Sequence, residues 1–454
     1  MAVSAVRAVL LQPDDDVAAV LEAVTVDNVI AVTLGTSGKT VSELTVRQEV
    51  PFGHKVAVRD IVKDKPVHRY GFPIGIATSD IKQGEHVHSH NMRSMLSPAS
   101  EQQSKSPTLR PARWVHDLVR SSLQAVGAAD SADAMADAIT EAHLRGVDTH
   151  GLRRLRPYIA RIRSGGVDGN SQPQVSSKNA LILVDGRNGI GHHIATLAAR
   201  AVSEAARQFG IAIALVRNSN HFGFAGYYAT LIAAQKQLGI VTSNGQVCVA
   251  PEGAKRPLLS NNPLAIAAPL RDPDRFLELD LATSVTSRAN IVEAAGSGSP
   301  MPAGWAQDAD GNPTRLPGAA LAGSLLAFGG NKGFALLVAL EALTGVLCGG
   351  AFADQVSSKE AAPGAPEGTA HTLIAIDLEL ALGASSYSDR LEELVGRLLA
   401  LPRNAAADAI RYPGERRWRL RRERLRDGIP LSDTELTDAA RLATELGIAS
   451  SAQG

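Results

Sequence analysis

The feature that most constrains this chain is a change of sequence character at residues 97–109, which read SPASEQQSKSPTL. Ser, Pro and Gln dominate the stretch, and it has no apolar periodicity, as is typical of a linker. A chain of 454 residues is also too long for one ordinary hydrophobic core. We therefore predict two domains, residues 1–96 and 110–454, joined by a linker at 97–109.

Residues 1–96 have the pattern of a small β-rich domain. Short β-branched runs, such as Val29–Thr33 and Lys55–Val58, alternate with turn residues. Glycines punctuate the segment at Gly53, Gly71, Gly75 and Gly84. This pattern predicts a β-sandwich or barrel and not a helical domain.

Residues 110–454 instead alternate between helical and strand patterns, which predicts an α/β fold with a layered core. Apolar spacing predicts helices over residues 115–126, 132–144, 194–209, 227–238, 334–347 and 432–446, with a cap at Ser432 or Asp433. Apolar runs predict strands over residues 180–184, 211–216 and 240–243. Residues 355–370 are polar and Pro/Gly-containing, so we expect an exposed loop there.

Charge and composition exclude several classes of protein. Lys+Arg and Asp+Glu both number 46, which argues against a nucleic-acid binder or a polybasic membrane protein. No apolar run approaches the ~20 residues of a membrane span, and the N-terminus lacks a convincing signal peptide, so we expect a cytoplasmic protein. The two cysteines, Cys248 and Cys348, form no CxxC pair, and we assign no metal-binding residues.

The first candidate for chemistry is the segment from Arg145 to Arg154, which directly follows a predicted helix. His150 can give or take a proton near working pH. An arginine such as Arg154 can hold a carboxylate in a planar fork of hydrogen bonds. The alternative is a helix end with solvated arginines, and the residues alone leave both interpretations open.

The second candidate, Asn218–Gly223, lies at the carboxyl end of the predicted strand 211–216. Ligands of α/β sheets bind outside the carboxyl ends of strands, and a buried polar Asn-Ser-Asn-His221 cluster is costly without a purpose. The alternative is a capping turn, but the position favours function.

The third candidate combines three short segments: residues 261–263, 279–284 and 329–333. The Gly-rich turn with Lys332 opens a predicted helix, where backbone N–H groups and a lysine suit a phosphate. A GGxKG pattern is weak, because a tight turn with an exposed lysine is common. No GxGxxG fingerprint follows a strand, since Gly186–Gly191 is spaced differently, so a Rossmann site is not predicted.

Two further clusters carry alternatives. His86, His88 and His90 share one face if the chain is a strand, which fits either a metal site or a polar edge that contacts another chain. Residues 411–426 contain eight arginines, with Glu415 and Glu423 interleaved. We expect a solvated helix with internal ion pairs, or a subunit interface, and not a nucleic-acid patch.

Six motifs of the larger domain occur in an order that resembles the malate/L-lactate dehydrogenase family, which includes sulfolactate, ureidoglycolate and diketogulonate dehydrogenases. The motifs are ADAITEAHLRGVDTHGLRRLRPY, VRNSNHFGFAGYY, SNNPLAIAAP, LDLATS, GGNKGFALL and RYPGERR. The resemblance implies a non-Rossmann NAD(P)-binding α/β fold, NAD or NADP as cofactor, and a homodimer.

The resemblance also implies roles for residues at matching positions. His221 is expected to move the proton at the substrate C2 oxygen, with His150 beside the nicotinamide and substrate, although the reverse assignment stays open. Arg154 is expected to hold the substrate carboxylate, and Asp280 to orient a histidine. The expected cofactor-binding residues are His150, Ser243, Asn262, Pro263, Ala282, Thr283, Ser284, Gly330, Lys332, Gly333, Gly414 and Glu415. Ala289-Asn290 stands where the family often has Gly-Lys, which leaves NAD and NADP undecided.

Residues 10–96 resemble the SAF-type domain of altronate and galactarate dehydratases and the small subunit of sulfolactate sulfo-lyase. VPFGHKVAVRDI and RYGFPIGIATSDIKQGEHVHSHNMR carry the likeness, and they include His54, His88, His90 and Asn91. That family does its catalytic metal chemistry in a separate large domain, so these residues alone are not expected to be a lyase. A large lyase or dehydratase subunit is a possible partner for them.

Both resemblances share a hydroxyacid. They therefore imply hydride transfer between nicotinamide and C2 of a 2-hydroxy/2-oxo acid, with sulfolactate/sulfopyruvate as first choice. The alternatives are a sugar-acid dehydrogenase, a cyclic imino acid reductase, and, from another class, a non-catalytic partner subunit of a dehydratase or sulfo-lyase.

Overall fold

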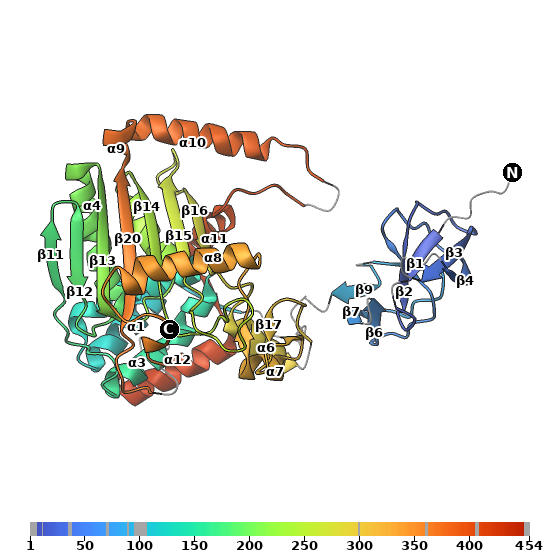
Figure 1. The fold of residues 1–454 in the computed structure, drawn as a ribbon, viewed down its shortest axis with the longest axis horizontal. Helices are drawn as coiled ribbons and strands as arrows, with labels where there is room; N and C mark the ends of the chain where they lie inside the picture. Colours follow the sequence, from blue (N-terminus) through green and yellow to red (C-terminus); the bar gives the residue numbers. More distant parts are fainter. Residues whose placement is uncertain are drawn as a thin grey trace. The chain divides into compact units, whose positions relative to one another are not determined.

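The computed structural model describes residues 7–10, 12–34, 39–69, 72–88, 90–94, 107–297, 300–358, 362–404 and 408–448. The chain forms two compact units, Met1–Lys105 and Ser106–Gly454 (Figure 1). Their division falls within the predicted linker. Thr108 and Leu109, which we had placed in that linker, instead belong to strand β10 (Thr108–Arg110), which pairs with β21 (Ile429–Leu431) of the second unit.

The first unit is β-rich, as the sequence predicts. A six-stranded sheet has the order β4-β3-β1-β2-β5-β8, and a three-stranded sheet has the order β6-β7-β9. The strands are β1 (Arg7–Leu10), β2 (Val17–Val20), β3 (Val29–Leu34), β4 (Lys39–Thr45), β5 (Lys55–Ala57), β6 (Pro66–Arg69), β7 (Phe72–Ala77), β8 (His86–Val87) and β9 (Met92–Ser94). Buried Val, Ile, Leu and Ala side chains give this unit its own hydrophobic core.

The second unit is built on a seven-stranded sheet of order β11-β12-β13-β20-β14-β15-β16. These strands are β11 (Gln174–Lys178), β12 (Leu181–Asp185), β13 (Ile211–Ser219), β14 (Gln237–Ser243), β15 (Leu264–Pro269), β16 (Phe276–Leu281) and β20 (Thr369–Asp377). Only the β12–β13 pair is parallel, and the other pairings are antiparallel. The sheet is therefore mixed and lacks the parallel order of a doubly wound nucleotide-binding fold.

Helices cover both faces of this sheet. Helices α4 (Gly191–Phe209) and α5 (Ala225–Ala233) pack on the face that carries alternate residues of β13, such as Ala212 and Ala214. Leu215 points to the other face, where it meets Cys348 just beyond α8 (Asn331–Glu341) and the π-helical turn Ala342–Val346. Figure 1 shows α8 crossing that face of the strands.

A second, helical layer has its own core. Helices α1 (Ala112–Ala125), α2 (Ala132–Leu144), α3 (Leu155–Arg163) and α12 (Asp433–Leu446) enclose a cluster of buried aliphatic side chains. Ser432 caps α12 in a reciprocal capping box with Glu435, as predicted for this terminus. Further elements of the unit are α6 (Arg288–Ser297), β17 (Ala306–Gln307), β18 (Pro313–Thr314), α7 (Pro317–Ala322), β19 (Ser324–Leu325), α9 (Leu378–Ala381), α10 (Ala384–Leu399) and α11 (Glu415–Asp427).

Two predicted segments differ from the structure. The helix expected over residues 227–238 ends at Ala233, because Gln237 already pairs with Asp377 and begins β14. The loop expected to be exposed at residues 355–370 is in part buried. Glu367, Thr369 and Ala370 lie in the interior, while residues 359–361 lie outside the described part.

Candidate active site

The His150 segment forms two short 3-10 turns after α2. Leu152 N donates to Nε2 of the buried His143 at 2.9 Å, which fixes the second turn. A side chain at Gly151 would put its Cβ 2.3 Å from that nitrogen, so only glycine fits. Within the turns, Arg154 Nε donates to Thr149 O at 3.1 Å, and Thr149 Oγ1 lies 3.0 Å from His150 Nδ1.

The His221 segment follows directly from the end of β13. The Asn220 side-chain amide donates to Asn188 O and Gly189 O, so the Gly-rich turn 186–191 fixes the position of Asn220. A Cβ at Gly191 would lie 2.1 Å from Asn220 O and 2.5 Å from His221 O. Gly191 belongs to the Gly-rich turn that does not fit a dinucleotide fingerprint. Its lack of a side chain allows the backbone of this turn to lie against Asn220 and His221.

The structure brings the two segments together. The rings of His150 and His221 are stacked, with centroids 5.8 Å apart and planes 7° apart. Arg154 and His221 also line the same cavity. His150, Arg154 and His221 therefore lie close together although they come from separate stretches of chain. Such an arrangement can bind a carboxylate through the guanidinium and transfer a proton beside it through an imidazole.

Tyr158 is a site residue to which the sequence assigned no role. Its hydroxyl lies 2.6 Å from His221 Nδ1. Burial holds the pKa of Tyr158 well above its ordinary value, so the phenol stays protonated and can donate. The Gly223 N–H also points to the same nitrogen, at 3.3 Å. The Tyr158 hydroxyl, which can donate or accept, and the Gly223 N–H therefore fix the orientation of the His221 ring at Nδ1.

Glu367 is a second residue that the sequence did not single out. Its Oε2 accepts a hydrogen bond from the His221 backbone N–H at 2.7 Å. It lies in the loop that we expected to be exposed, where no periodicity or motif marks it. Only the tertiary contact identifies it.

A buried series of hydrogen bonds connects the segment before His221 to the central sheet. His371 joins Ser243 Oγ to Ser219 Oγ, with both distances 2.8 Å, and its ring stacks on Phe222 at 4.4 Å. Burial lowers the pKa of His371 to about 3, so the ring is neutral. The hydroxyl of Ser243, expected in the cofactor site, is therefore engaged inside the protein.

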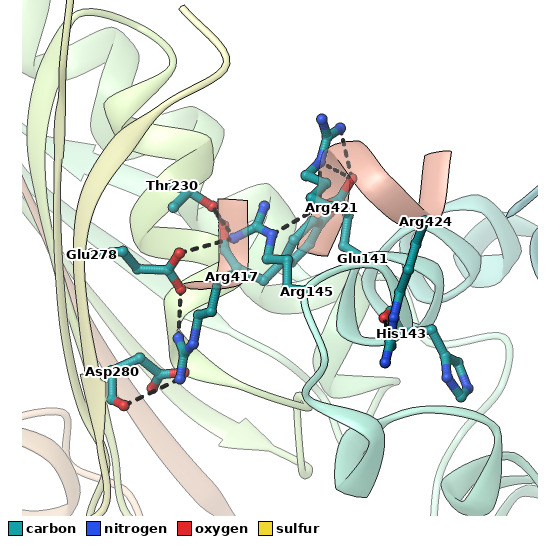
Figure 2. A network of polar contacts seen from close by, with 10 residues as sticks. Glu141, His143, Arg145, Thr230, Glu278, Asp280, Arg417, Arg421 and Arg424 are labelled. Atoms are coloured by element: carbon teal, nitrogen blue, oxygen red, sulfur yellow. Dashed lines mark hydrogen bonds and ion pairs between the residues drawn. The ribbon is translucent and has the colours of Figure 1, made fainter. Parts of the chain in front are cut away.

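Asp280 does not orient a histidine in this structure. Its carboxylate pairs with Arg417 of α11 at 3.0 Å, and Arg417 also binds Glu278 at 2.6 Å (Figure 2). Desolvation raises the pKa of Asp280 and of Glu278. The prediction that Asp280 orients a histidine comes from its motif alone. The motif carries no information about Arg417, which lies on a helix far away in the sequence.

The arginine-rich helix α11 is more than a solvated helix. Arg417, Arg421 and Arg424 recur at helical spacing, so they share one face. Arg421 pairs with Glu141 of α2 at 2.9 Å, and Arg424 pairs at 2.9 Å with Asp148 of the His150 turn. Figure 2 shows Arg417 beside Glu278 and Asp280 of β16, with Arg421 beside Glu141 and Arg424 beside His143 of α2. One expected internal pair, Arg419–Glu423, is present at 3.2 Å.

The expected cofactor segments meet beside the start of α8. Thr283 N donates to Asn261 O, and Phe328 N donates to Thr283 O, each at 2.9 Å. Asn262 Nδ2 donates to Glu341 Oε2 at 2.6 Å, while its buried Oδ1 has no hydrogen-bond partner within the described residues.

The other expected cofactor residues have the following places. Lys332 is exposed in the first turn of α8, which has no side-chain cap at Gly330. Pro263 precedes β15, Ala282 and Ser284 follow β16, Gly333 is buried in α8, and Gly414 and Glu415 start α11.

The first unit gathers four imidazoles. His54 Nδ1 lies 2.9 Å from His86 Nε2, and the rings of His88 and His90 lie within 5.5 Å of other rings in the cluster. Desolvation and the neighbouring imidazoles lower the pKa of His86 to about 4. Across the described ranges, no group of three or more His, Cys, Asp or Glu residues is arranged to hold a metal ion. Cys348 is a buried thiol that forms no disulfide.

The mixed sheet and the paired imidazoles beside an arginine define the class of an α/β oxidoreductase outside the Rossmann type. Residues 111–439 match the family model described as malate/L-lactate dehydrogenase, and the chain belongs to that family of NAD(P)-dependent 2-hydroxyacid dehydrogenases. Residues 6–95 match the altronate/galactarate dehydratase SAF domain.

Individual relatives support the same assignment. A (2R)-3-sulfolactate dehydrogenase (NADP(+)) of Chromohalobacter salexigens is 35% identical over 313 residues, which cover 69% of this chain and 91% of that protein. A Δ1-pyrroline-2-carboxylate/Δ1-piperideine-2-carboxylate reductase of Pseudomonas putida is 32% identical over 329 residues, 72% of this chain and 94% of that protein. The sulfolactate dehydrogenase structure from Methanocaldococcus jannaschii has a TM-score of 0.69 at 29% identity and covers 75% of this chain and 98% of that chain.

Proposed function

We propose that this protein interconverts a 2-hydroxy acid and its 2-oxo acid with NAD or NADP, and that sulfolactate/sulfopyruvate is the substrate pair. The observation that carries the proposal is that Arg154 and His221 line one cavity and that the ring of His150 stacks on His221. The sulfolactate dehydrogenases among the relatives support the choice of substrate. The first unit supports it too, because its resemblance extends to a subunit of sulfolactate sulfo-lyase.

The nicotinamide ring supplies the hydride chemistry at C2 of the acid. The residues of this chain do the rest. Arg154 holds the carboxylate and so fixes which face of C2 is presented. His221, held at Nδ1 by the Tyr158 hydroxyl, acts as an imidazolium that gives its Nε2 proton to the C2 oxygen in reduction and is left neutral. In oxidation the neutral ring, with Nε2 unprotonated, takes the hydroxyl proton. His150, stacked beside it, borders the same space.

The residues beside α8 fit a dinucleotide. The uncapped N-terminus of α8 and the exposed Lys332 suit a phosphate. Farther along the helix, the Asn262 Oδ1, which has no partner among the described residues, can accept a hydrogen bond. Between NAD and NADP the sequence gives no preference, because Ala289-Asn290 lies where the family often has Gly-Lys.

Other functions make different demands on the same site. A sugar-acid dehydrogenase would use the same three residues on a longer, polyhydroxylated acid. A cyclic imino acid reductase is favoured by the reductases among the relatives. A non-catalytic partner subunit would have no need for the convergent His150, Arg154 and His221.

The experiment is a substrate panel followed by NADH and NADPH absorbance. We expect sulfopyruvate to be reduced with the highest kcat/KM, ahead of 2-oxo sugar acids and cyclic imines. A cyclic imine as the preferred substrate would replace this proposal with the reductase. Absence of turnover on every substrate would favour the partner-subunit alternative.

We also propose a homodimer. In the described part, the α9–α10 region exposes large apolar side chains: Leu380 is 61% exposed, Leu382 53% and Leu394 51%. Exposed apolar surface of this kind is typical of protein interfaces. Light scattering should give twice the mass of the 47.6 kDa chain, and a monomer at micromolar concentration would contradict the assignment. A lyase or dehydratase large subunit remains a candidate partner of residues 1–96.

A further inference from the structure

A small cavity opens beside the proposed proton-transfer residue. Its volume is about 40 Å³, and Arg154, Tyr158, Arg161, His192, His221 and Glu367 contribute polar groups to its wall. The remainder of the wall includes apolar side chains such as Met135, Ile162, Val167 and Ile190. A buried water occupies on the order of 10–15 Å³ of such a cavity, so this cavity has room for about three waters. That is the size of an oxyanion head group and too small for a whole hydroxyacid.

Two buried side chains on this wall have polar atoms without partners. Arg161 is 6% exposed, and its Nε and Nη1 make no hydrogen bond to the described residues. Its Nη2 is used, since it donates to Gly166 O at 2.8 Å and to Ala365 O at 3.0 Å. His192 is 1% exposed, and its Nδ1 is also unpartnered within the described residues.

The charge around the cavity leaves room for an anion. Arg161 Nη1 lies 3.9 Å from Glu367 Oε1, which is too far for a hydrogen bond but offsets one positive charge. Arg154 adds a second cation, so the two arginines outweigh the single carboxylate. Burial lowers the pKa of His192 to about 3, so its ring contributes no charge. A buried cation with unused N–H groups is costly unless a charged or polar partner fills the space.

We infer that this cavity is a subsite for a second acidic group of the substrate, carried on C3 of the 2-oxo acid. The inference rests on the proposed function, in which Arg154 holds the C1 carboxylate. Arg161 then donates its free N–H groups to the distal sulfonate or carboxylate. The low-dielectric wall strengthens that contact. The substrate class is therefore a 2-oxo acid with two acidic groups, and Arg161 determines specificity between such acids and monoacids.

The test compares kcat/KM for sulfopyruvate and oxaloacetate, which carry an acidic group on C3, with that for pyruvate, which does not. We expect the wild type to prefer both diacids over pyruvate. In Arg161→Gln this preference should fall about tenfold to hundredfold, as expected for a lost hydrogen bond to a charged group. Arg163→Gln is the matched control, because Arg163 lies on the same helix but is exposed. It should leave the preference unchanged.

A purely structural role of Arg161 predicts a different result. Arg161→Gln would then lower kcat/KM for diacids and pyruvate equally, which would overturn the subsite. If Arg161→Gln does not fold, Val167→Met fills the cavity from its apolar wall and should reduce the diacid preference while pyruvate turnover is retained. An unchanged preference in Val167→Met would also overturn the subsite.

The two proposals fail in distinguishable ways. Wild-type reduction of diacids and pyruvate with similar kcat/KM sinks the subsite but leaves the dehydrogenase function standing. Failure to reduce any 2-oxo acid sinks the dehydrogenase function, and the subsite with it. A preference for sulfopyruvate over oxaloacetate identifies a sulfonate as the distal group, and the opposite preference identifies a carboxylate.

Discussion

The position of His221 is fixed by hydrogen bonds from three parts of the chain. Its ring is held at Nδ1 by Tyr158 and Gly223, and its backbone N–H is held by Glu367. The fixed ring can therefore move a proton through Nε2 without first reorienting. These contacts come from α3, from its own loop and from the segment before β20, so the ring orientation is a property of the tertiary structure.

Changing His221 to Ala should lower kcat for sulfopyruvate reduction by about a hundredfold or more, because the imidazole that transfers the proton in the proposed mechanism is removed. Binding of NADH or NADPH, measured by fluorescence titration, should remain. The matched control is His193→Ala on α4, a histidine that neighbours Asp130 and Arg200 instead. Retention of wild-type turnover by the His221 variant would remove His221 from the mechanism.

Changing Tyr158 to Phe should lower kcat about tenfold, because the His221 ring loses the hydrogen bond that holds it at Nδ1. The pH dependence of kcat should change at the same time, which loss of packing alone would not cause. KM should change little, since Tyr158 acts through His221 in this mechanism. An unaltered pH profile would show that the 2.6 Å contact has no part in proton transfer.

At the scale of elements, α11 connects parts of the site that are far apart in sequence. Arg417 binds Glu278 and Asp280 at the end of β16, where the LDLATS motif begins, and Arg424 binds Asp148 at the start of the His150 turn. One helix therefore fixes both the LDLATS segment and the His150 turn. Arg417, Arg421 and Arg424 of α11 are engaged by carboxylates of other elements of the fold.

Changing Arg417 to Met should destabilise the protein by about 3–5 kcal/mol, because Asp280 loses its cation and the fully buried Glu278 keeps only Arg145, at 3.6 Å. Arg419→Met, which removes only an exposed pair with Glu423, should cost about 0.5 kcal/mol or less. Urea unfolding of both variants tests this contrast. Equal effects would mean that the buried network does not stabilise the fold.

The same variant should respond to pH in a defined direction. Desolvation raises the pKa of Glu278 in the folded state, so the folded protein binds this proton more tightly than the unfolded chain does. Stability linked to Glu278 therefore increases as pH falls toward the raised pKa. The destabilisation by Arg417→Met should be larger at about pH 8 than at about pH 5.5. The opposite trend would contradict the view that desolvation raises the pKa of Glu278 in the folded protein.

At the scale of the whole molecule, the chain consists of two units with separate hydrophobic cores. The proposed proton-transfer and carboxylate-binding residues all come from the second unit. Residues 107–454 expressed alone should therefore keep kcat and KM within about twofold of the full chain, since each unit can bury its own core. Loss of dehydrogenase activity in this fragment, with its circular dichroism spectrum intact, would show that the first unit contributes to the site.

Much of this protein could be predicted from sequence because the signals are local. The β-rich and α/β halves, the polar stretch between them and the Ser432 cap follow from periodicity and turn chemistry over short windows. The resemblance gave the correct family, and it pointed to His150, Arg154 and His221, which the structure brings to one place. The roles of these residues and of the cofactor segments remain predictions.

The tertiary structure decided what no local pattern carries. The helix expected to reach Leu238 ends early because Gln237 pairs with Asp377 of β20, more than a hundred residues away in the sequence. Asp280 pairs with Arg417 instead of a histidine, and Glu367 reaches His221 from a segment that reads as an exposed loop. The physical reason is common to all three: a hydrogen bond or ion pair depends on distance in space, and folding brings together residues whose separation along the chain leaves no periodic trace.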